Sequence, residues 1–291
     1  MKKQEQEQKP QVNIQDIEYE TEAVEEHANV LFKPNPGPQT DFLAASEREV
    51  LYGGSAGGGK SYAMLADPLR YMGHPQFSGL LLRHTTEELR ELIFKSQELY
   101  PKIWPGIKWS ERKMQWTAPS GARLWMSYLD RDEDVLRYQG LAFSWIGFDE
   151  LTQWGSPYAW NYMRSRLRST APDLPIFMRA TTNPGGRGHH WVKKMFIDPA
   201  PYNKAYDATD IETGETLRYP AGHSKAGKPL FKRRFIPARL SDNPYLSEAG
   251  DYEAMLLSLP EQQRKQLLQG DWDIKEGAAF TEFDRDIHVV E

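Results

Sequence analysis

The 291-residue sequence contains no cysteine, which excludes disulfide bonds, thiolate metal sites and thiol-based catalysis. It also lacks an apolar run long enough to cross a bilayer, and its start, MKKQEQEQKP, has no apolar stretch of the signal-peptide type. Acidic side chains outnumber basic ones by 41 to 36, and this balance argues weakly against a protein coated with nucleic acid. We therefore expect a soluble protein of a reducing compartment, without membrane association.

Charge is distributed unevenly along the chain. Residues 1–30 hold eight acidic side chains and three lysines in a glutamine-rich context, and we expect a flexible acidic N-terminal arm there. Between Trp160 and Arg239, fifteen Lys and Arg residues stand against six Asp and Glu residues. A polyanion would bind in this part of the chain, although a solvated basic face without a partner has the same composition.

The stretch GSAGGGKS carries the most specific signal in the sequence. It matches the phosphate-binding pattern G-x-x-x-x-G-K-[ST] at every position, namely Gly54, Ser55, Ala56, Gly57, Gly58, Gly59, Lys60 and Ser61. A strand-like run at 49–52 precedes it, and a helix-like run at 61–71 follows and adds its dipole at the same point. The glycines let backbone amides turn toward an anion, Lys60 would reach the β- and γ-phosphates, and Ser61 would hold Mg²⁺. The sequence thus predicts a nucleoside triphosphate site.

A second apolar strand, 143–148, ends in the consecutive carboxylates Asp149 and Glu150. Adjacent side chains on a strand point to opposite sides, so the two carboxylates suit different tasks. Asp149 would hold Mg²⁺ beside Ser61, and Glu150 would orient and deprotonate the attacking water. An Asp-Glu pair is also a common solvated strand end, but its place after the phosphate loop favours catalysis. We expect the pair one strand away from that loop, and we interpret the glutamate as typical of an ATP-hydrolysing motor.

Two further positions complete the candidate site. The strand at 176–180 runs into Thr181-Thr182-Asn183-Pro184, where Thr182 or Asn183 would sense the γ-phosphate. A turn in which the Asn183 side chain bonds its own backbone is the structural alternative. Upstream of the phosphate loop, Gln39 carries a donor and an acceptor that suit the edge of adenine.

Strand and helix patterns alternate between these motifs. Further strand-like runs lie at 79–83 and, as a hairpin, at 114–118 and 123–128, and Thr85 or Thr86 would cap a helix after the first of them. This alternation predicts an α/β fold, a P-loop NTPase of the ASCE type with a central, mostly parallel sheet flanked by helices. We expect the ATPase core at 31–240 and a small helical lid or linker subdomain at 241–275.

In combination, these motifs resemble the large terminase subunit of tailed bacteriophages, the ATPase that drives DNA into procapsids. The resemblance extends from about Pro36 to the end of the chain and rests on PQT, GGSAGGGKS, LLLRHTTEELR, YQGLAFSWIGFDELTQW and TTNPGG in that order. It implies that Gln39 contacts adenine, that 54–61 is the Walker A loop, and that Asp149 with Glu150 is Walker B with the catalytic glutamate. It also implies that 181–183 couples hydrolysis to motion.

The resemblance further implies cofactors and partners. These are ATP and Mg²⁺, double-stranded DNA, the portal protein, the small terminase subunit and a homo-oligomeric, pentameric ring in the cytoplasm of the infected bacterial host. The family uses an arginine that reaches a neighbouring subunit's nucleotide, for which Arg137 is the leading candidate and Arg83 the alternative. The sequence does not select among the basic residues that would contact DNA, which are Arg164, Arg166, Arg168, Arg187, Lys232, Arg233 and Arg234.

Large terminase subunits usually carry a second, nuclease domain with clustered carboxylates. Residues 276–291 resemble the start of the linker to it, so we expect that Asp284 and Asp286 are not nuclease ligands and that the chain does not cleave DNA. Two other functions remain open, a helicase or another nucleic-acid-dependent P-loop ATPase, and a nucleotide-binding assembly switch without turnover. Intact Lys60, Asp149 and Glu150 argue against the switch.

Overall fold

The computed structural model describes residues 32–247 and 250–274. Contacts divide the chain into two units, Met1–Lys33 and Pro34–Glu291, and the elements below belong to the second. The acidic arm predicted at 1–30 and the linker predicted at 276–291, with Asp284 and Asp286, lie outside the described residues.

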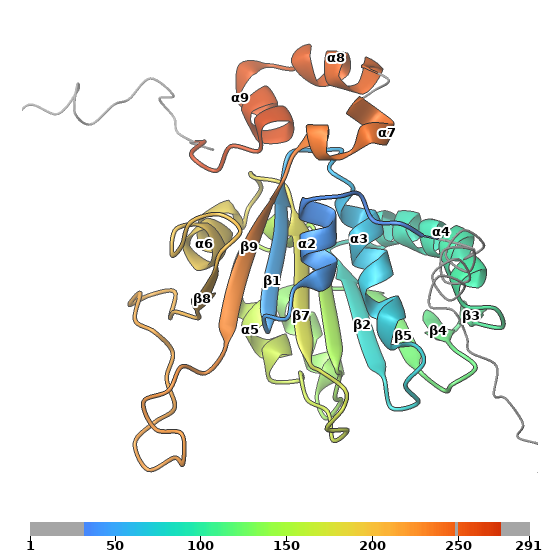
Figure 1. Cartoon of the computed structure of the whole chain (residues 1–291), viewed down its shortest axis with the longest axis vertical. Coiled ribbons are helices and arrows are strands. Elements are labelled where there is room, and N and C mark those ends of the chain that lie inside the picture. The colour runs from blue at the N-terminus through green and yellow to red at the C-terminus, as the bar shows by residue number, and fades with distance from the viewer. Residues whose placement is uncertain (1–31, 248–249, 275–291) are drawn as a thin grey trace, which may run out of the picture. The chain divides into compact units, whose positions relative to one another are not determined.

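One sheet organises the described part of the second unit, and nine strands there follow the order β3-β4-β5-β2-β6-β7-β1-β9-β8 (Figure 1). The parallel strands are β5 (Arg123–Tyr128), β2 (Ser78–Arg83), β6 (Trp145–Asp149), β7 (Phe177–Thr182), β1 (Glu49–Gly54) and β9 (Lys232–Ala238). The antiparallel strands at the edges are β4 (Gln115–Thr117) and β3 (Lys108–Ser110) on one side and β8 (Ala205–Asp207) on the other. The mostly parallel α/β fold and the β4–β5 hairpin are therefore confirmed.

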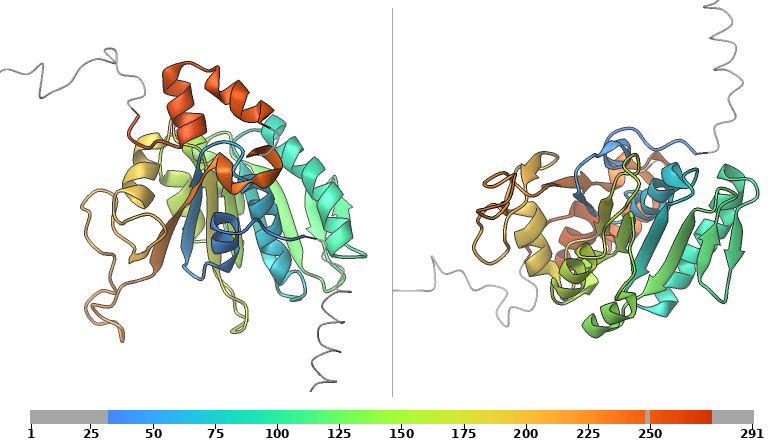
Figure 2. Two further views of the ribbon diagram at one scale, coloured as in Figure 1. Left: turned by 45° about the horizontal axis from the view of Figure 1, so that its top comes forward. Right: turned by 90° about the horizontal axis from the view of Figure 1, so that it is seen from below.

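Helices cover both faces of this sheet (Figure 2). One face carries α2 (Pro38–Ala44), α3 (Lys60–Ala66), η1 (Asp67–Tyr71) and α4 (Thr86–Ile103). The other carries η2 (Asp132–Tyr138), η3 (Leu151–Gln153), α5 (Tyr158–Arg164), α6 (His189–Val192) and the π-helical η4 (Lys193–Ile197). Across the residues that the structure describes, no helix combines the length and the apolar character that crossing a membrane requires.

A run of short helices follows β9 and lies above the carboxyl ends of the parallel strands, at the top of Figure 1. Its elements are η5 (Leu240–Asp242), α7 (Pro244–Ser247), α8 (Asp251–Leu257), α9 (Glu261–Arg264) and η6 (Lys265–Gln269). We call the described residues from 240 to 274 the helical lid. Its helical character agrees with the pattern expected at 241–275, while the domain boundaries themselves stay a prediction.

Side-chain alternation along the strands builds a separate core on each face. Leu80 and Leu82 of β2 join the core beneath α5 and α6, whereas Leu81 between them joins the core beneath α3 and α4. Each of the three is fully buried, and such burial stabilises the fold by roughly 1.5–3 kcal/mol per leucine. The central strands are apolar on both sides for this reason, as expected of a parallel sheet with two covered faces.

Local sequence signals set the helix ends near the carboxyl edge of the sheet. The Thr85 hydroxyl accepts a hydrogen bond from the Glu88 amide, and the Glu88 carboxylate accepts one from the Thr85 amide, which forms a capping box at the start of α4. The prediction that Thr85 or Thr86 caps this helix is confirmed. Pro68 ends the α-helical part of the run predicted at 61–71, because proline supplies no amide donor, and η1 continues it as a 3₁₀ turn.

The strand order corrects one expectation. β7 lies between β1 and β6, so Asp149 and Glu150 emerge two strands away from the phosphate loop, and the expectation of one strand is wrong. The register pairs Thr181 of β7 with Asp149 on one side and Thr182 with Gly53 on the other. The 181–183 segment therefore lies between the loop and the carboxylates, which suits the coupling role that the resemblance implies.

Candidate active site

The phosphate loop follows β1 directly and turns through glycines with positive φ. Gly54, Gly57 and Gly59 have φ values of 145°, 78° and 75°, a region that side chains rarely adopt. A Cβ at Gly59 would also lie 2.8 Å from the side-chain nitrogen of Gln39. The loop ends at Lys60, the first residue of α3, so the amino end of that helix points into it.

Lys60 is buried at the base of the loop. Its ammonium donates to the carbonyl oxygen of Ser55 at 2.6 Å, and 6% of the residue is exposed. Burial lowers the pKa of this ammonium, and the negative charges of Glu150 and Asp149 oppose that shift. The lysine and the two carboxylates are therefore close enough to influence one another electrostatically, while their joint role in a site stays a prediction.

Gln39 lies against the phosphate loop, where both ends of its side-chain amide have partners. The amide nitrogen donates to the carbonyl oxygen of Gly59 at 2.9 Å, and the amide oxygen accepts from the Asn35 backbone at 2.6 Å. Only 4% of the residue is exposed. These contacts give Gln39 a role in holding the loop, and the adenine contact stays a prediction.

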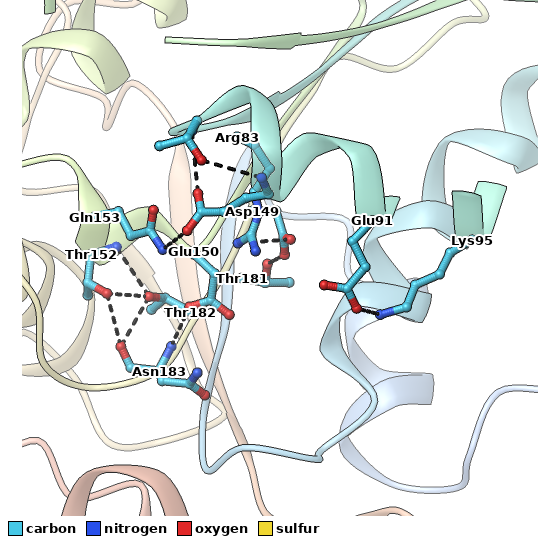
Figure 3. Close-up of polar contacts among 12 residues, drawn as sticks. Arg83, Glu91, Lys95, Asp149, Glu150, Thr152, Gln153, Thr181, Thr182 and Asn183 are labelled. Atoms are coloured by element: carbon cyan, nitrogen blue, oxygen red, sulfur yellow. Dashed lines mark hydrogen bonds and ion pairs between the residues drawn. The ribbon is translucent and has the colours of Figure 1, made fainter. Parts of the chain in front are cut away.

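Asp149, at the end of β6, is held from two sides. Its Oδ1 accepts a hydrogen bond from the Thr181 hydroxyl, and its Oδ2 lies 3.3 Å from Nη1 of Arg83 (Figure 3). Oδ2 is buried and has no hydrogen-bond donor among the described residues. A fixed carboxylate oxygen without a donor is the kind of ligand that Mg²⁺ takes in proteins, so the residue fits the metal role predicted for it with Ser61.

Glu150 follows in a backbone conformation that few residues adopt, with φ 60° and ψ 57°. Its Oε2 accepts from the backbone amide of Asn183 at 3.3 Å. Burial raises the pKa of the Glu150 carboxyl, the charge of Asp149 raises it further, and Lys60 and Arg83 act in the opposite direction. A carboxylate with a raised pKa is a stronger base than an ordinary one, which suits proton removal from water.

The 181–183 segment, at the end of β7, is bonded to both carboxylates, and Figure 3 shows its three polar residues beside them. The Thr182 hydroxyl shares a hydrogen bond of 2.7 Å with that of Thr152, while the neighbouring Thr181 contacts Asp149. The side-chain oxygen of Asn183 is buried without a partner among the described residues. Of the two residues predicted as sensors, Asn183 has the unpartnered side-chain oxygen, and the sensor role stays a prediction. The contact of Thr181 with Asp149 is one that the sequence did not indicate.

The two candidate arginines lie in different environments. Arg83 points into the site of its own chain, with 13% of its side chain exposed beside Asp149. Arg137 lies on η2 with 47% of its side chain exposed, and it donates to the carbonyl oxygens of Tyr128 at 2.8 Å and Asp134 at 3.2 Å. Of the two candidates, Arg137 is therefore the exposed one, whereas Arg83 contacts a carboxylate of its own chain, and the choice between them stays a prediction.

The helical lid rests on the phosphate loop. The Ala56 amide donates to the carbonyl oxygen of Leu267 at 2.6 Å, and the side chain of Asn243 donates to the Gly57 carbonyl oxygen at 2.7 Å. Gly270 approaches so closely that a Cβ there would lie 2.7 Å from the Ser55 nitrogen. Any rearrangement of the loop on binding a phosphate therefore acts directly on the lid.

Several of the basic residues considered for DNA are turned inward. Glu49 has no exposed surface and forms ion pairs with Arg233 at 2.7 Å and with Arg164. Burial by itself would raise the pKa of the Glu49 carboxyl. The ion pairs with Arg233 and Arg164 outweigh this effect, so the pKa is lowered. Arg187 and Arg168 are exposed instead. Arg233, with 1% exposure, is a structural residue of the sheet.

The fold is that of a P-loop NTPase of the ASCE type, in which β7 lies between β1, which leads into the phosphate loop, and β6, which ends in Asp149. A family model described as "Terminase large subunit, T4likevirus-type, N-terminal" matches residues 51–287. The chain therefore belongs to this family of large terminase subunits. No curated protein matches its sequence.

Solved structures of large terminases have the same fold. The large terminase of a thermophilic bacteriophage, solved in complex with ADP, aligns over 89% of this chain with a TM-score of 0.59 and 16% identity. A mutant ATPase domain of the large terminase from Thermus phage P74-26 aligns over 82% of this chain and 94% of its own, with a TM-score of 0.54 and 12% identity. This chain covers 58% of the ADP-bound terminase, so it spans less than two thirds of that relative.

Proposed function

We propose that the chain is the ATP-hydrolysing motor part of a large terminase subunit, which couples ATP hydrolysis to the movement of double-stranded DNA into a procapsid. The carrying observation is geometric: Lys60 begins the helix that follows the phosphate loop, and β7, which pairs with β1 before that loop, ends in residues bonded to Asp149 and Glu150. Family membership supports the packaging role. The similar terminase that was solved with ADP supports a nucleotide as the ligand.

The proposed chemistry uses the chain's residues for positioning, charge and one proton. Backbone amides of the loop and Lys60 hold the triphosphate, and Ser61 and Asp149 would hold Mg²⁺, which when bound neutralises charge on the phosphates. Water attacks the γ-phosphorus while Glu150 accepts its proton. The bond from the γ-phosphorus to the bridging oxygen breaks, and ADP and inorganic phosphate leave.

Loss of the γ-phosphate reaches the rest of the chain through the 181–183 segment and the lid in this proposal. Asn183 bonds Glu150 through its backbone amide and keeps a free side-chain oxygen near the site. The lid bonds the phosphate loop at Ala56 and Gly57. These contacts give two routes by which hydrolysis moves neighbouring elements.

We further propose that active sites are completed between subunits of a homo-oligomeric ring, with Arg137 reaching the neighbour's nucleotide. The double-stranded DNA, the portal protein and the small terminase subunit would be the partners of that ring, in the cytoplasm of the infected bacterial host. An arginine supplied in this way increases the hydrolysis rate by about 10³ to 10⁵. Isolated subunits should therefore hydrolyse ATP slowly.

The test is ATPase activity per subunit against protein concentration, with and without DNA, for the wild type, Glu150→Gln and Arg137→Ala. Arg90→Ala, which changes an exposed arginine on α4, is the matched control. We expect a steep rise with concentration for the wild type and the control, and loss of activity in the other two variants. Full activity of Arg137→Ala would remove that residue from the mechanism.

Two readouts separate the proposal from the other functions. A forked duplex should be translocated without strand separation, whereas a helicase would unwind it. ATP binding without turnover at high concentration and with DNA present would instead indicate an assembly switch. Cleavage of plasmid DNA by the purified chain in Mg²⁺ would overturn the expectation that it is not a nuclease.

A further inference from the structure

The longest part of the sequence without a carboxylate side chain is 216–241, which contains seven Lys and Arg residues. Its first part, residues 216–231, belongs to the connection between β8 and β9 and is called the basic loop below. Figure 1 shows this connection extending from the amino end of β9, at the end of the sheet opposite the helical lid. Parallel pairing of β1 with β9 puts the phosphate loop at the other end, so the basic loop is remote from the ATP site.

Short-range backbone bonds, not a core, order the basic loop. The bridge between Arg218 and Pro229 is closed by hydrogen bonds from the Tyr219 amide to the Lys228 carbonyl oxygen and from the Gly227 amide to the Tyr219 carbonyl oxygen, both 3.0 Å. Residues 220–228 are exposed throughout. Fixing each residue costs about 1–2 kcal/mol, so an ordered segment that buries so little is more typical of a contact surface than of a stabilising element.

Three cations at the end of the basic loop lack acidic partners. Arg218, Lys225 and Lys228 form no salt bridge within the described residues. Arg218 instead donates to the carbonyl oxygen of Gly227 at 2.8 Å, and the ammonium of Lys225 lies 5.7 Å from the centre of the Tyr219 ring. Both contacts hold a cation in place without neutralising it.

The neighbouring cations at the start of β9 are paired, which makes the loop stand out. Lys232 lies 3.3 Å from Asp207, Arg233 lies 2.7 Å from Glu49, and Arg234 lies 3.8 Å from Glu47. In the sequence, the charged side chains of 216–241 are all basic. In the structure, carboxylates neutralise the cations at the start of β9 but not those of the basic loop.

The chemistry of this end suits a row of phosphates better than a protein partner. The cations are separated by small residues, which leave room for a phosphate backbone to approach the loop; these are Ala221, Gly222, Ser224 and Ala226. Tyr219 is stacked on His223 with ring centres 4.5 Å apart and is half-buried, so the loop offers no free aromatic anchor of the kind that dominates protein interfaces. Unneutralised Lys and Arg on a polar surface are the usual contacts to the DNA backbone.

We propose that Arg218, Lys225 and Lys228 of the basic loop bind the phosphate backbone of double-stranded DNA, independently of base sequence. The inference rests on the proposed function, because it identifies the surface of the motor that binds DNA. It places the DNA contact at the end of the sheet away from the ATP chemistry, so the two are separable by mutation.

The test measures binding of the chain to a fluorescent duplex of mixed sequence by anisotropy, over a series of salt concentrations. The variant is Arg218→Ala/Lys225→Ala/Lys228→Ala. The matched control, Lys102→Ala/Arg112→Ala/Lys113→Ala, removes the same charges from exposed positions near the β3 edge, at the other side of the sheet. Lys225→Ala/Lys228→Ala, which keeps the Arg218 bond to the loop, guards against misfolding of the triple variant.

We expect the slope of log K against log salt to fall by roughly 2 to 3 in the triple variant, with at least about tenfold weaker binding near 0.1 M salt. The control should bind like the wild type, and ATPase activity without DNA should be unchanged in all variants. Wild-type DNA affinity in both loop variants overturns the inference, and so does an equal loss of DNA affinity in the control. Neither result contradicts the proposed motor function. A wild type that neither binds DNA nor is stimulated by it would contradict the proposed function itself.

Discussion

Glu49 provides a quantitative test of how the sheet accommodates charge. The carboxylate has no exposed surface and is shared by Arg233, at 2.7 Å, and Arg164. In Glu49→Gln, the amide oxygen accepts from one guanidinium while the amide nitrogen faces the other, so a buried cation loses its acceptor. Breaking a buried pair in this way costs about 3–5 kcal/mol. For a domain of this size the loss corresponds to a fall of roughly 6–20 °C in Tm.

Urea unfolding followed by tryptophan fluorescence measures this loss, with Tm from calorimetry as a second readout. The matched control is Asp207→Asn, which breaks a surface pair with Lys232 and should cost at most about 1 kcal/mol. A Glu49→Gln variant as stable as Asp207→Asn would refute the reasoning, because it would mean that the cluster relaxes without an uncompensated charge.

The pH dependence of the same cluster follows from the direction of its pKa shift. The Glu49 pKa is lowered from its ordinary value of 4.5, since the pairs with Arg233 and Arg164 outweigh burial. A lowered pKa means that the stabilisation is fully present above pH 4.5 and is lost as the pH falls through the pKa of the folded chain. The difference in stability between wild type and Glu49→Gln should therefore shrink only below about this pH.

The remaining predictions concern the active site. Glu150→Gln should lower kcat for ATP hydrolysis by about 10² to 10⁴ while ATP still binds, and turnover near wild type would exclude Glu150 as the base. Because the Glu150 pKa is raised, the acid limb of the wild-type kcat/KM profile should lie above pH 4.5, and a limb at or below that value contradicts its assignment. Thr181→Val removes the hydrogen-bond donor to Asp149, worth about 1.5–3 kcal/mol, and should raise the Mg²⁺ concentration needed for half-maximal rate, unlike the control Thr117→Val on β4. Gly57→Ala would put a Cβ 2.7 Å from a lid leucine at a φ of +78°, so we expect a lower Tm in thermal unfolding, and an unchanged Tm would show that the lid yields freely.

The parts of the site that short motifs define could be predicted from the sequence. Gly54–Ser61 and the pair Asp149 and Glu150 lie at strand ends, where a fixed spacing and an apolar run mark both the element and its edge. Strand order is different, because it depends on which strands pair across the whole sheet. The sequence alone therefore did not show that β7 lies between β1 and β6, or that Thr181 contacts Asp149.

Charge composition was the less informative guide. Arg179 and Arg233 count toward the basic excess of 160–239, yet both are buried, Arg179 beside Asp67 and Arg233 beside Glu49. Their partners come from distant parts of the sequence, so no local count reveals the pairing. The same limit explains why the sequence ranked Arg137 before Arg83 but did not show that Arg83 lies beside Asp149 and that Arg137 is exposed.

The close approach of Gly270 to the phosphate loop links two sections of the gene that are far apart. Position 270 has a φ of +64°, and a Cβ there would meet the backbone of Ser55 and Gly54, which cannot move aside as a flexible side chain does. A substitution at position 270 therefore requires a change in the backbone of the phosphate loop, and a change in that backbone alters which residues position 270 accepts. The two stretches should consequently diverge together among descendants of this gene.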